Sequence, residues 1–227
     1  MLTDTTLLTL LQWVSPALPI GGFNYSEGIE TLVAQQHLTT AAALEDWLTF
    51  ELRHGSAQLE AAVIVRAYRA VEKGDLDRLR YWNSWLSAVR ETEELRAQNW
   101  QMGTALMALV QTLEGDRVPL ELQAAHPYPW NTSVAFSVAA AIAPIPLDIA
   151  VLGYLQSWLS TLISAAVKLV PLGQTAGQVL LRQLRPHVSA AVQQSLDRAD
   201  ADLESCTLGL ALASMQHETQ YSRLFRS

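Results

Sequence analysis

Apolar residues recur along most of this chain at the three- and four-residue spacing of amphipathic helices. The first helix is expected to follow Thr3 and Asp4, whose side chains suit a helix N-terminus. Asn24 and Glu27 have the spacing of a capping box, which predicts that they open a second helix. From there on, the pattern predicts helices over 25–36, 40–73, 75–90, 91–113, 133–143, 148–168, 174–184, 186–197 and 200–213.

Glycine and proline mark the breaks between these segments. The stretch 15–23 holds two prolines and a Gly-Gly pair, Gly55 is expected to divide the long 40–73 segment, and a loop is expected from His126 to Ser133. The chain has 37 leucines and 31 alanines against 23 valines and isoleucines, which favours helices over a large sheet. With no repeat and no linker visible, the sequence predicts an all-α, single-domain bundle of about ten helices spanning 1–227.

Charge and cysteine content exclude several classes of protein. The formal net charge is −7, which disfavours a general nucleic-acid binder because such proteins need a basic face. Cys206 is the only cysteine, so a disulfide within the chain and a cysteine-rich zinc site are excluded. This cysteine usage fits the reducing cytoplasm. The first residues lack a basic segment, and we expect no signal peptide.

The segment 149–167 is uncharged over 19 residues, a length that could cross a membrane. Because glutamine, serine and threonine side chains are spread through it, we expect a buried helix of a soluble protein instead. Small residues recur at every fourth position and would let another helix approach closely, either from the same chain or from a second subunit. These residues are Gly153, Ser157, Thr161 and Ala165.

Few residues have the spacing of a chemical site. Gly173 and Gly177 resemble a phosphate loop only superficially, because three residues separate them and no lysine follows. No two histidines stand three or four residues apart, so no helical metal-binding pair is predicted. We interpret Cys206 as a core residue. For His217 we expect a solvated or hydrogen-bonded position in the tail rather than a titrating or weakly metal-binding one. The acidic residues at 91–94 suit the positive end of a helix dipole.

Two polar segments are harder to assign to core packing. Lys168 ends the uncharged helix just before a turn at 171–178, although a cation at a helix C-terminus needs no further reason. Residues 215–227 combine aromatic side chains with two arginines, residue types that are enriched at protein interfaces, although a disordered end would also account for them. We therefore predict that 215–227 is a partner-binding C-terminal tail.

Four blocks of this sequence resemble the UreF-type urease accessory proteins, in the same order and from end to end of the chain. The segment between Leu113 and Ser133 resembles that family least. The four blocks are 15–30 (SPALPIGGFNYSEGIE), 90–96 with 101–103 (RETEELR and QMG), 168–174 with 177–178 (KLVPLGQ and GQ), and 217–227 (HETQYSRLFRS).

The resemblance implies a usually dimeric, cytoplasmic, all-helical protein with no catalysis, metal site or cofactor of its own. Proteins of this type bridge UreD, also called UreH, and the GTPase UreG. Their assembly delivers nickel to the urease apoprotein, and GTP binding and hydrolysis by UreG control the transfer. The resemblance therefore implies a scaffold that regulates UreG, with neither a nucleic-acid nor a membrane partner.

Carried over residue by residue, the resemblance implies two partner surfaces. The surface toward UreG is expected to contain Lys168, Pro171, Gly173, Gln174, Gly177, Gln178, Glu27 and Glu30. The surface toward UreD is expected to contain Tyr25, Tyr221, Arg223, Leu224, Phe225 and Arg226, in a tail that becomes ordered when UreD binds.

Three other functions stay open at this point. A small-molecule enzyme would use Cys206 or His217, and a membrane protein would use the 149–167 segment. A GTPase-activating protein for UreG would supply an arginine to the transition state. The arginines in the family-like blocks are Arg90, Arg96, Arg223 and Arg226.

Overall fold

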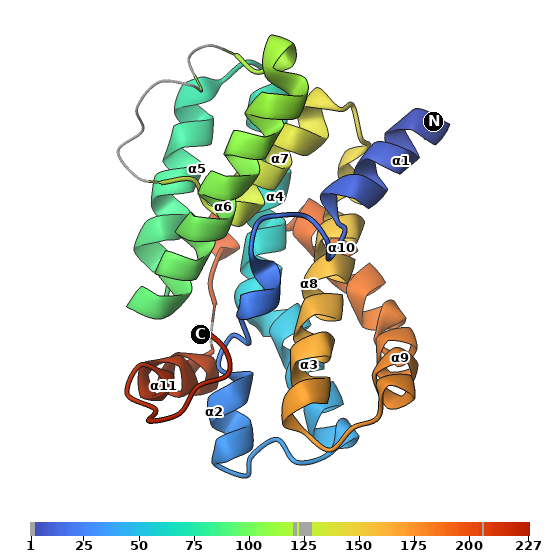
Figure 1. The fold of residues 1–227 in the computed structure, drawn as a ribbon. Helices are drawn as coiled ribbons and strands as arrows, with labels where there is room; N and C mark the ends of the chain where they lie inside the picture. Colours follow the sequence, from blue (N-terminus) through green and yellow to red (C-terminus); the bar gives the residue numbers. More distant parts are fainter. Residues whose placement is uncertain (1–2, 120–121, 123–128, 206) are drawn as a thin grey trace.

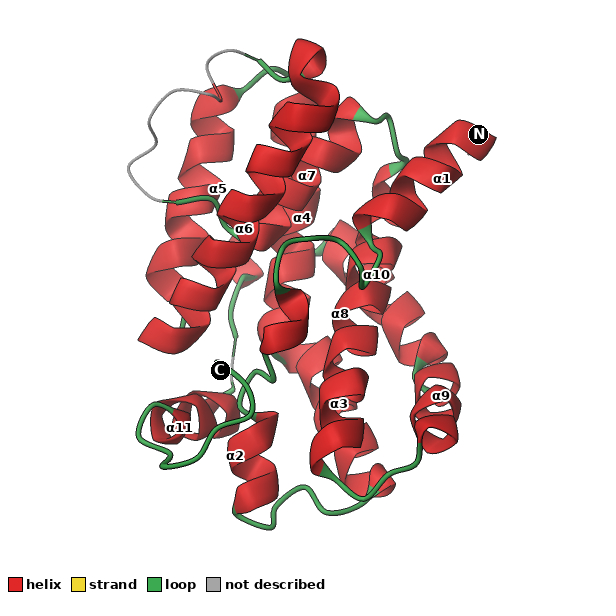
Figure 2. Cartoon of the chain, viewed as in Figure 1, coloured by secondary structure: helices red, strands yellow, loops and turns green. Residues whose placement is uncertain are grey.

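The computed structural model describes residues 3–119, 122, 129–205 and 207–227, and within these ranges it contains helices and loops but no β-strand (Figures 1 and 2). The predicted all-α fold is therefore confirmed. His126 and Cys206 lie outside these ranges. The loop start predicted at His126 and the core position predicted for Cys206 therefore concern residues outside the described part of the chain.

Eleven α-helices lie within the described residues. They are α1 (Asp4–Trp13), α2 (Ile29–Ala34), α3 (Ala41–His54), α4 (Ser56–Glu72), α5 (Leu76–Val89), α6 (Glu93–Glu114), α7 (Thr132–Ile142), α8 (Leu147–Leu169), α9 (Gln174–Gln183), α10 (Arg185–Asp197) and α11 (Leu208–His217). Short 3-10 turns are η1 (Gly22–Asn24), η2 (Gly115–Arg117) and η4 (Asp200–Asp202).

Helix α4 forms the centre of the bundle. It contacts α3, α5, α7, α8 and α10, and Val63, Ile64 and Val65 on successive faces are fully buried. A helix that is apolar all round can be stable only where other helices cover every face. Consequently the run AAVIV at 61–65 places α4 inside the molecule (Figure 1).

The division of the 40–73 segment at Gly55 is confirmed. Helix α3 ends at His54 and α4 begins at Ser56. A Cβ atom on Gly55 would lie 2.7 Å from the Cα atom of Glu51, so only glycine allows this close approach.

The predicted capping box at Asn24 and Glu27 is wrong. Glu27 and Gly28 have positive φ values of 49° and 78°, which a right-handed helix cannot accommodate, so α2 begins only at Ile29. The Glu27 carboxylate does not cap a helix. It accepts hydrogen bonds from Gln98 and from the Trp158 indole, which are distant in sequence.

The start of the last helix also differs from the prediction of 200–213, since α11 begins at Leu208. Asp200 is held by Arg66 at 2.7 Å and by Arg78 at 2.6 Å. These ion pairs hold the backbone at η4 against α4 and α5. Helix α11 therefore starts only at Leu208, after the chain has passed these contacts.

The small residues of α8 contact a helix of the same chain. A Cβ atom on Gly153 would lie 2.8 Å from the Leu10 side chain and 3.2 Å from that of Val14. The Ser157 hydroxyl donates to the Val14 carbonyl at 3.0 Å. Of the two partners left open by the sequence, the internal one, α1 with the residue that follows it, covers Gly153 and Ser157, whereas Thr161 and Ala165 line a cavity.

Helix α8 is, among the described residues, the one helix long and apolar enough to span a membrane, and 44% of its most apolar stretch is buried inside the molecule. Leu155 and Leu159 are fully buried, and the helix contacts α4, α7, α9 and α10. Core packing thus accounts for the apolar side chains on the buried face of α8.

Candidate functional site

The predicted tail consists of a helical part and an extended part. Met215 to His217 complete α11, whereas residues 218–227, called the tail from here on, run back along the start of α2. The Arg226 amide donates to the Asn24 carbonyl at 2.8 Å, and the Ser26 amide donates to the Ser227 carbonyl at 2.7 Å. The first and last family-like blocks therefore lie side by side (Figure 1).

Glu30 is the main anchor of the tail. Its carboxylate accepts the backbone amide of Leu224 at 2.6 Å and that of Phe225 at 2.9 Å. The residue is buried beneath the tail. A residue expected on the surface toward UreG thus contacts the segment expected to face UreD.

His217 is fully buried between two carboxylates. Its Nε2 atom lies 3.2 Å from Glu30, and its Nδ1 atom lies 3.0 Å from both oxygens of Glu94. Arg223 of the tail lies 3.4 Å from Glu94. Burial raises the pKa of the Glu94 carboxyl, and the hydrogen bond from His217 opposes that rise. Glu94 therefore has a long-range partner besides its place in the first turn of α6.

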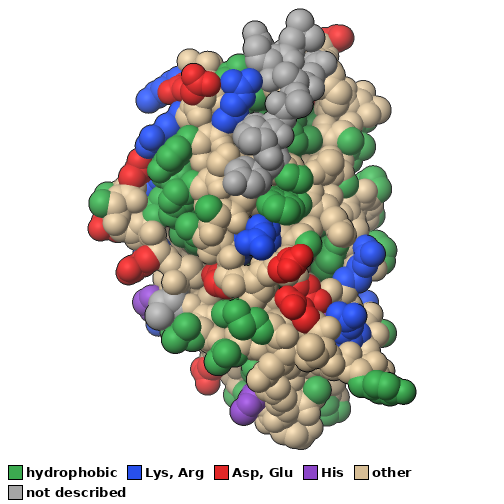
Figure 3. Space-filling model, turned by 90° about the vertical axis from the view of Figure 1, so that its left-hand side faces the viewer, with side chains coloured by type: hydrophobic (Ala, Val, Ile, Leu, Met, Phe, Trp, Pro, Cys, Tyr) green, Lys and Arg blue, Asp and Glu red, His purple; other side chains and the backbone are tan. Residues whose placement is uncertain are grey.

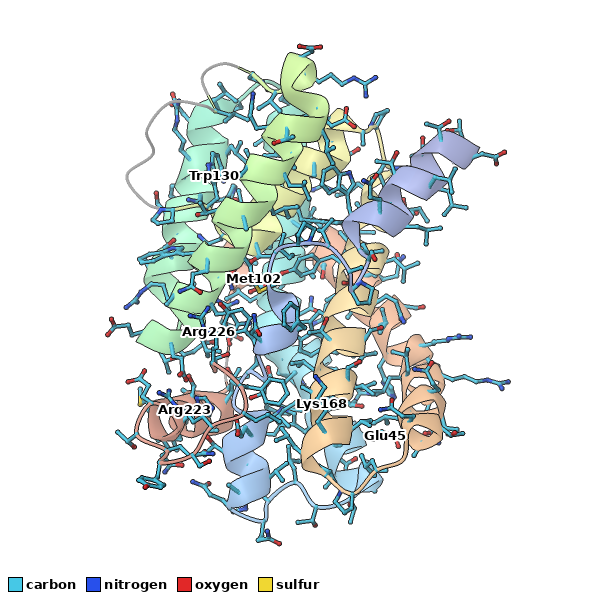
Figure 4. All side chains as sticks on the ribbon, in the orientation of Figure 1. Glu45, Met102, Trp130, Lys168, Arg223 and Arg226 are labelled. Atoms are coloured by element: carbon cyan, nitrogen blue, oxygen red, sulfur yellow. The ribbon has the colours of Figure 1, made fainter. Side chains whose placement is uncertain are left out.

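Tyr25 meets the docked tail through Gln101 of α6. The Tyr25 hydroxyl donates to Gln101 Oε1 at 2.7 Å, and Arg226 donates to the same oxygen at 3.4 Å. Burial raises the pKa of Tyr25, and the nearby Arg226 charge opposes the rise. In Figure 4, Arg226 points from the tail toward α6.

Lys168 and Phe225 bring the two predicted partner surfaces into contact. Phe225 is 6% exposed, and the Lys168 Nζ atom lies 5.5 Å from the centre of its ring. That distance is within the range of a cation–π interaction. Lys168 is also in the last turn of α8, where a positive charge suits the helix dipole.

The rest of the predicted surface toward UreG lies around the junction of α8 and α9. Gly177 is buried there, and a Cβ atom on it would lie 2.9 Å from the Val167 side chain of α8. The close approach of α9 to α8 thus needs glycine, and the polar side chains remain outside. The exposed members are Lys168, Pro171, Gly173, Gln174 and Gln178.

Apolar side chains are exposed on α11 and on the tail. Tyr221 is fully exposed and Leu224 is 65% exposed. Leu208, Leu212 and Met215 are exposed at helical spacing on one side of α11. Figure 3, seen from the side of α5, α6 and α11, shows hydrophobic side chains among charged ones on this face.

A cavity of about 150 Å³ lies beneath the 13–27 segment, between α6 and α8. Glu60 in its wall is paired with Arg90 and accepts hydrogen bonds from Asn99 and Tyr154. Glu27 also lines it, and burial raises the pKa of its carboxyl. Among the described residues, no group of three or more histidines, cysteines and acids is arranged to hold a metal ion.

Glu51, near the same network, is buried at the end of α3. Burial first, and then the neighbouring carboxylate of Glu27, raise its pKa to about 8. One of its oxygens accepts the Ser56 amide at 3.2 Å, which adds a cap to the start of α4.

The four arginines named for a GTPase-activating role differ in accessibility. Arg90 is buried in its ion pair with Glu60, so it cannot reach a partner in this conformation. Arg96 lies 5.8 Å from the Trp100 ring. Arg223 and Arg226 are exposed on the tail.

Several residues of the site were not found from the sequence. Gln98 accepts the Ser227 hydroxyl at 2.5 Å and donates to Glu27, while Thr31 donates to Gln220 of the tail at 3.2 Å. Single polar residues on amphipathic helices give no periodic signal. Only their closeness to family-like blocks, 90–96 and 101–103 for Gln98 and 15–30 for Thr31, could have directed attention to them.

The comparisons with known proteins agree on one family. The family model described as UreF matches residues 38–185. The chain is 70% identical over 227 residues to the urease accessory protein UreF of Thermosynechococcus vestitus, with both chains fully covered. It is 50% identical over 226 residues to the protein of that name from Nostoc, covering 100% of this chain and 98% of the relative. The corresponding protein of Chromohalobacter salexigens is 42% identical over 221 residues, with 97% and 94% covered.

Proposed function

The chain belongs to the UreF family of urease accessory proteins, and on that premise we propose that it is a non-catalytic, cytoplasmic scaffold that bridges UreD and the GTPase UreG. The assembly would insert nickel into the urease apoprotein under the control of GTP. In this role nickel is cargo, and the chain needs no cofactor, nucleic acid or membrane. The observation that carries the proposal is the docked tail, which places exposed apolar side chains beside α11.

We propose that UreD binds to the surface formed by the tail and α11. Tyr221, Arg223 and Arg226 are exposed and of the residue types enriched at interfaces, and Leu224 adds exposed apolar area beside them. Tyr25 and Phe225 are buried, and their part is to hold the tail in the shape that UreD meets.

We propose that UreG binds around the junction of α8 and α9. Lys168, Gln174 and Gln178 offer one positive charge and several amide groups at an exposed turn. Glu27 and Glu30 would support this surface from within, by holding the 13–27 segment and the tail in place. The contact of Lys168 with Phe225 supports the idea that the two partners bind adjacent parts of one surface.

The test on the UreD side is a pull-down of purified UreD by the full chain and by a chain lacking residues 218–227. We expect the deletion to abolish capture of UreD while the helical circular-dichroism signal is retained, because the deleted residues are not helical. Capture of UreD by the truncated chain at full strength would refute the assignment. The complete chain with Lys73→Ala, a change far from the tail in sequence, serves as the control for surface mutation.

The alternative function is a GTPase-activating protein for UreG, and the exposure of Arg223 and Arg226 keeps it in view. An arginine finger contributes about 10³–10⁵ in rate. If this function holds, replacing one of Arg96, Arg223 and Arg226 with lysine or with alanine should therefore lower GTP hydrolysis in the complete complex by orders of magnitude. Unchanged hydrolysis in all of these variants would exclude it. We also propose a homodimer, which light scattering of the free chain tests.

A further inference from the structure

The environment of His217 goes beyond the role of a hydrogen-bonded core residue. The imidazole is fully buried, and each of its two nitrogens faces a carboxylate: Glu30 from α2 and Glu94 from α6. The other charged groups near this bridge are Arg223 and Glu218 of the tail. His217 therefore joins three elements, α2, α6 and α11, at the point where the tail begins.

The number of protons in the bridge follows from its geometry. A neutral imidazole has one N–H group, so it can donate to only one carboxylate. Its other nitrogen would then direct a lone pair at the oxygens of the second carboxylate, in a site closed to water. Both contacts are hydrogen bonds only if the bridge holds one further proton, on the second ring nitrogen or on the facing carboxyl. The raised pKa of Glu94 favours retention of that proton.

The same carboxylates hold the tail. Glu30 accepts the amides of Leu224 and Phe225, and Glu94 pairs with Arg223. If the proton leaves, repulsion between His217 and one carboxylate must be relieved by movement of Glu30, of Glu94 or of α11. Any of these movements loosens a tail contact.

We infer that the bridge Glu30–His217–Glu94 is a protonation-dependent latch that holds the tail against α2 when it carries its second proton and releases the tail when that proton is lost. Because the docked state binds a proton that the released state does not, docking weakens as pH rises. The consequence for UreD rests on the proposed function: the surface made by the tail would be complete at lower pH and incomplete at higher pH.

The experiment is amide hydrogen exchange at Leu224 and Phe225 in the full chain, with the intrinsic pH dependence of exchange divided out. Loss of one hydrogen bond to a charged group predicts that protection falls by about tenfold or more between about pH 6 and about pH 9. The Glu94→Gln variant should abolish this fall, because an amide can donate to or accept from a neutral imidazole. Glu93→Gln, which removes the same charge from an exposed neighbouring position, should behave like the wild type.

Equal protection at both pH values in the wild-type chain would overturn the inference, whatever the variants do. A fall in protection in Glu94→Gln as large as in the wild type would overturn it as well. If His217 had a merely structural role, Glu94→Gln and Glu93→Gln would show the same dependence of protection on pH. The assay contains no partner protein. If the latch operates as described but UreD is not captured at about pH 6, it is the proposed function that fails and not the latch.

Discussion

Phe225 is the buried aromatic side chain of the tail, and its replacement by alanine tests whether its burial helps to hold the tail in place. The ring is 6% exposed, whereas the other aromatic residue of the tail, Tyr221, is fully exposed. Burial of a phenylalanine side chain contributes about 1.5–3 kcal/mol, and the Lys168 contact adds a little more. A loss of about 2–3 kcal/mol shifts the equilibrium between docked and released tail by about 30- to 150-fold.

Trypsin cleavage after Arg223 measures that equilibrium. The protease cleaves only an extended backbone, so it acts on chains whose tail is released. When docking and release are fast compared with cleavage, the cleavage rate is proportional to the fraction of chains with a released tail. We expect loss of residues 224–227, followed by mass spectrometry, to accelerate in Phe225→Ala by a factor in the range given above. Tyr221→Ala removes an aromatic ring from the same tail and should leave the rate near that of the wild type. Equal rates in Phe225→Ala and Tyr221→Ala would refute the reasoning that burial of Phe225 holds the tail.

Three further predictions concern other parts of the molecule. Lys168→Ala should weaken capture of UreG in a pull-down while the thermal melt is unchanged, and replacement of Lys73, the other lysine of the chain, should have no effect on either. Gly103→Ala should lower the melting temperature, because its Cβ atom would lie 2.1 Å from a backbone oxygen of the loop before α7 and overpacking costs about 1–3 kcal/mol. Gly209→Ala should leave the melting temperature unchanged, because the nearest atom to its Cβ atom would be 3.4 Å away. The Glu51 carboxyl keeps its proton up to about pH 8 in the folded chain but loses it near pH 4.5 in the unfolded chain. The folded state is therefore less stable as pH rises between these values, and the urea midpoint of unfolding should fall. Glu51→Gln, which has no proton to lose, should reduce that fall.

Local spacing was enough to predict most of the helices. Apolar periodicity and the glycine between α3 and α4 are visible within one or two turns of sequence, and no distant residue is needed to interpret them. The two wrong helix starts, at Asn24 and at 200, have a common cause. Glu27 and Asp200 bind partners more than a hundred residues away along the chain, and those contacts override the local preference for a helix.

The site was predictable only in part for the same reason. The end blocks 15–30 and 217–227 were identified as candidate partner surfaces, but nothing in their spacing indicates that they meet. The contact of Ser26 with Ser227 joins residues 201 positions apart. The resemblance placed Glu30, together with Glu27, on the other partner surface, and its role as anchor of the tail depends on the fold. For His217 the sequence left a solvated and a hydrogen-bonded position open. The side chain is fully buried and hydrogen-bonded, and its two carboxylate partners come from other helices.

The central claim is that this chain joins UreD and UreG, and co-purification tests it most directly. The chain, UreD and UreG would be expressed together, supplied with a GTP analogue and Mg²⁺, and sized by light scattering. The account predicts one species that contains all three proteins, and loss of UreD from it when residues 218–227 are deleted. Elution of the chain alone, with UreD and UreG both soluble in the same sample, would contradict the account.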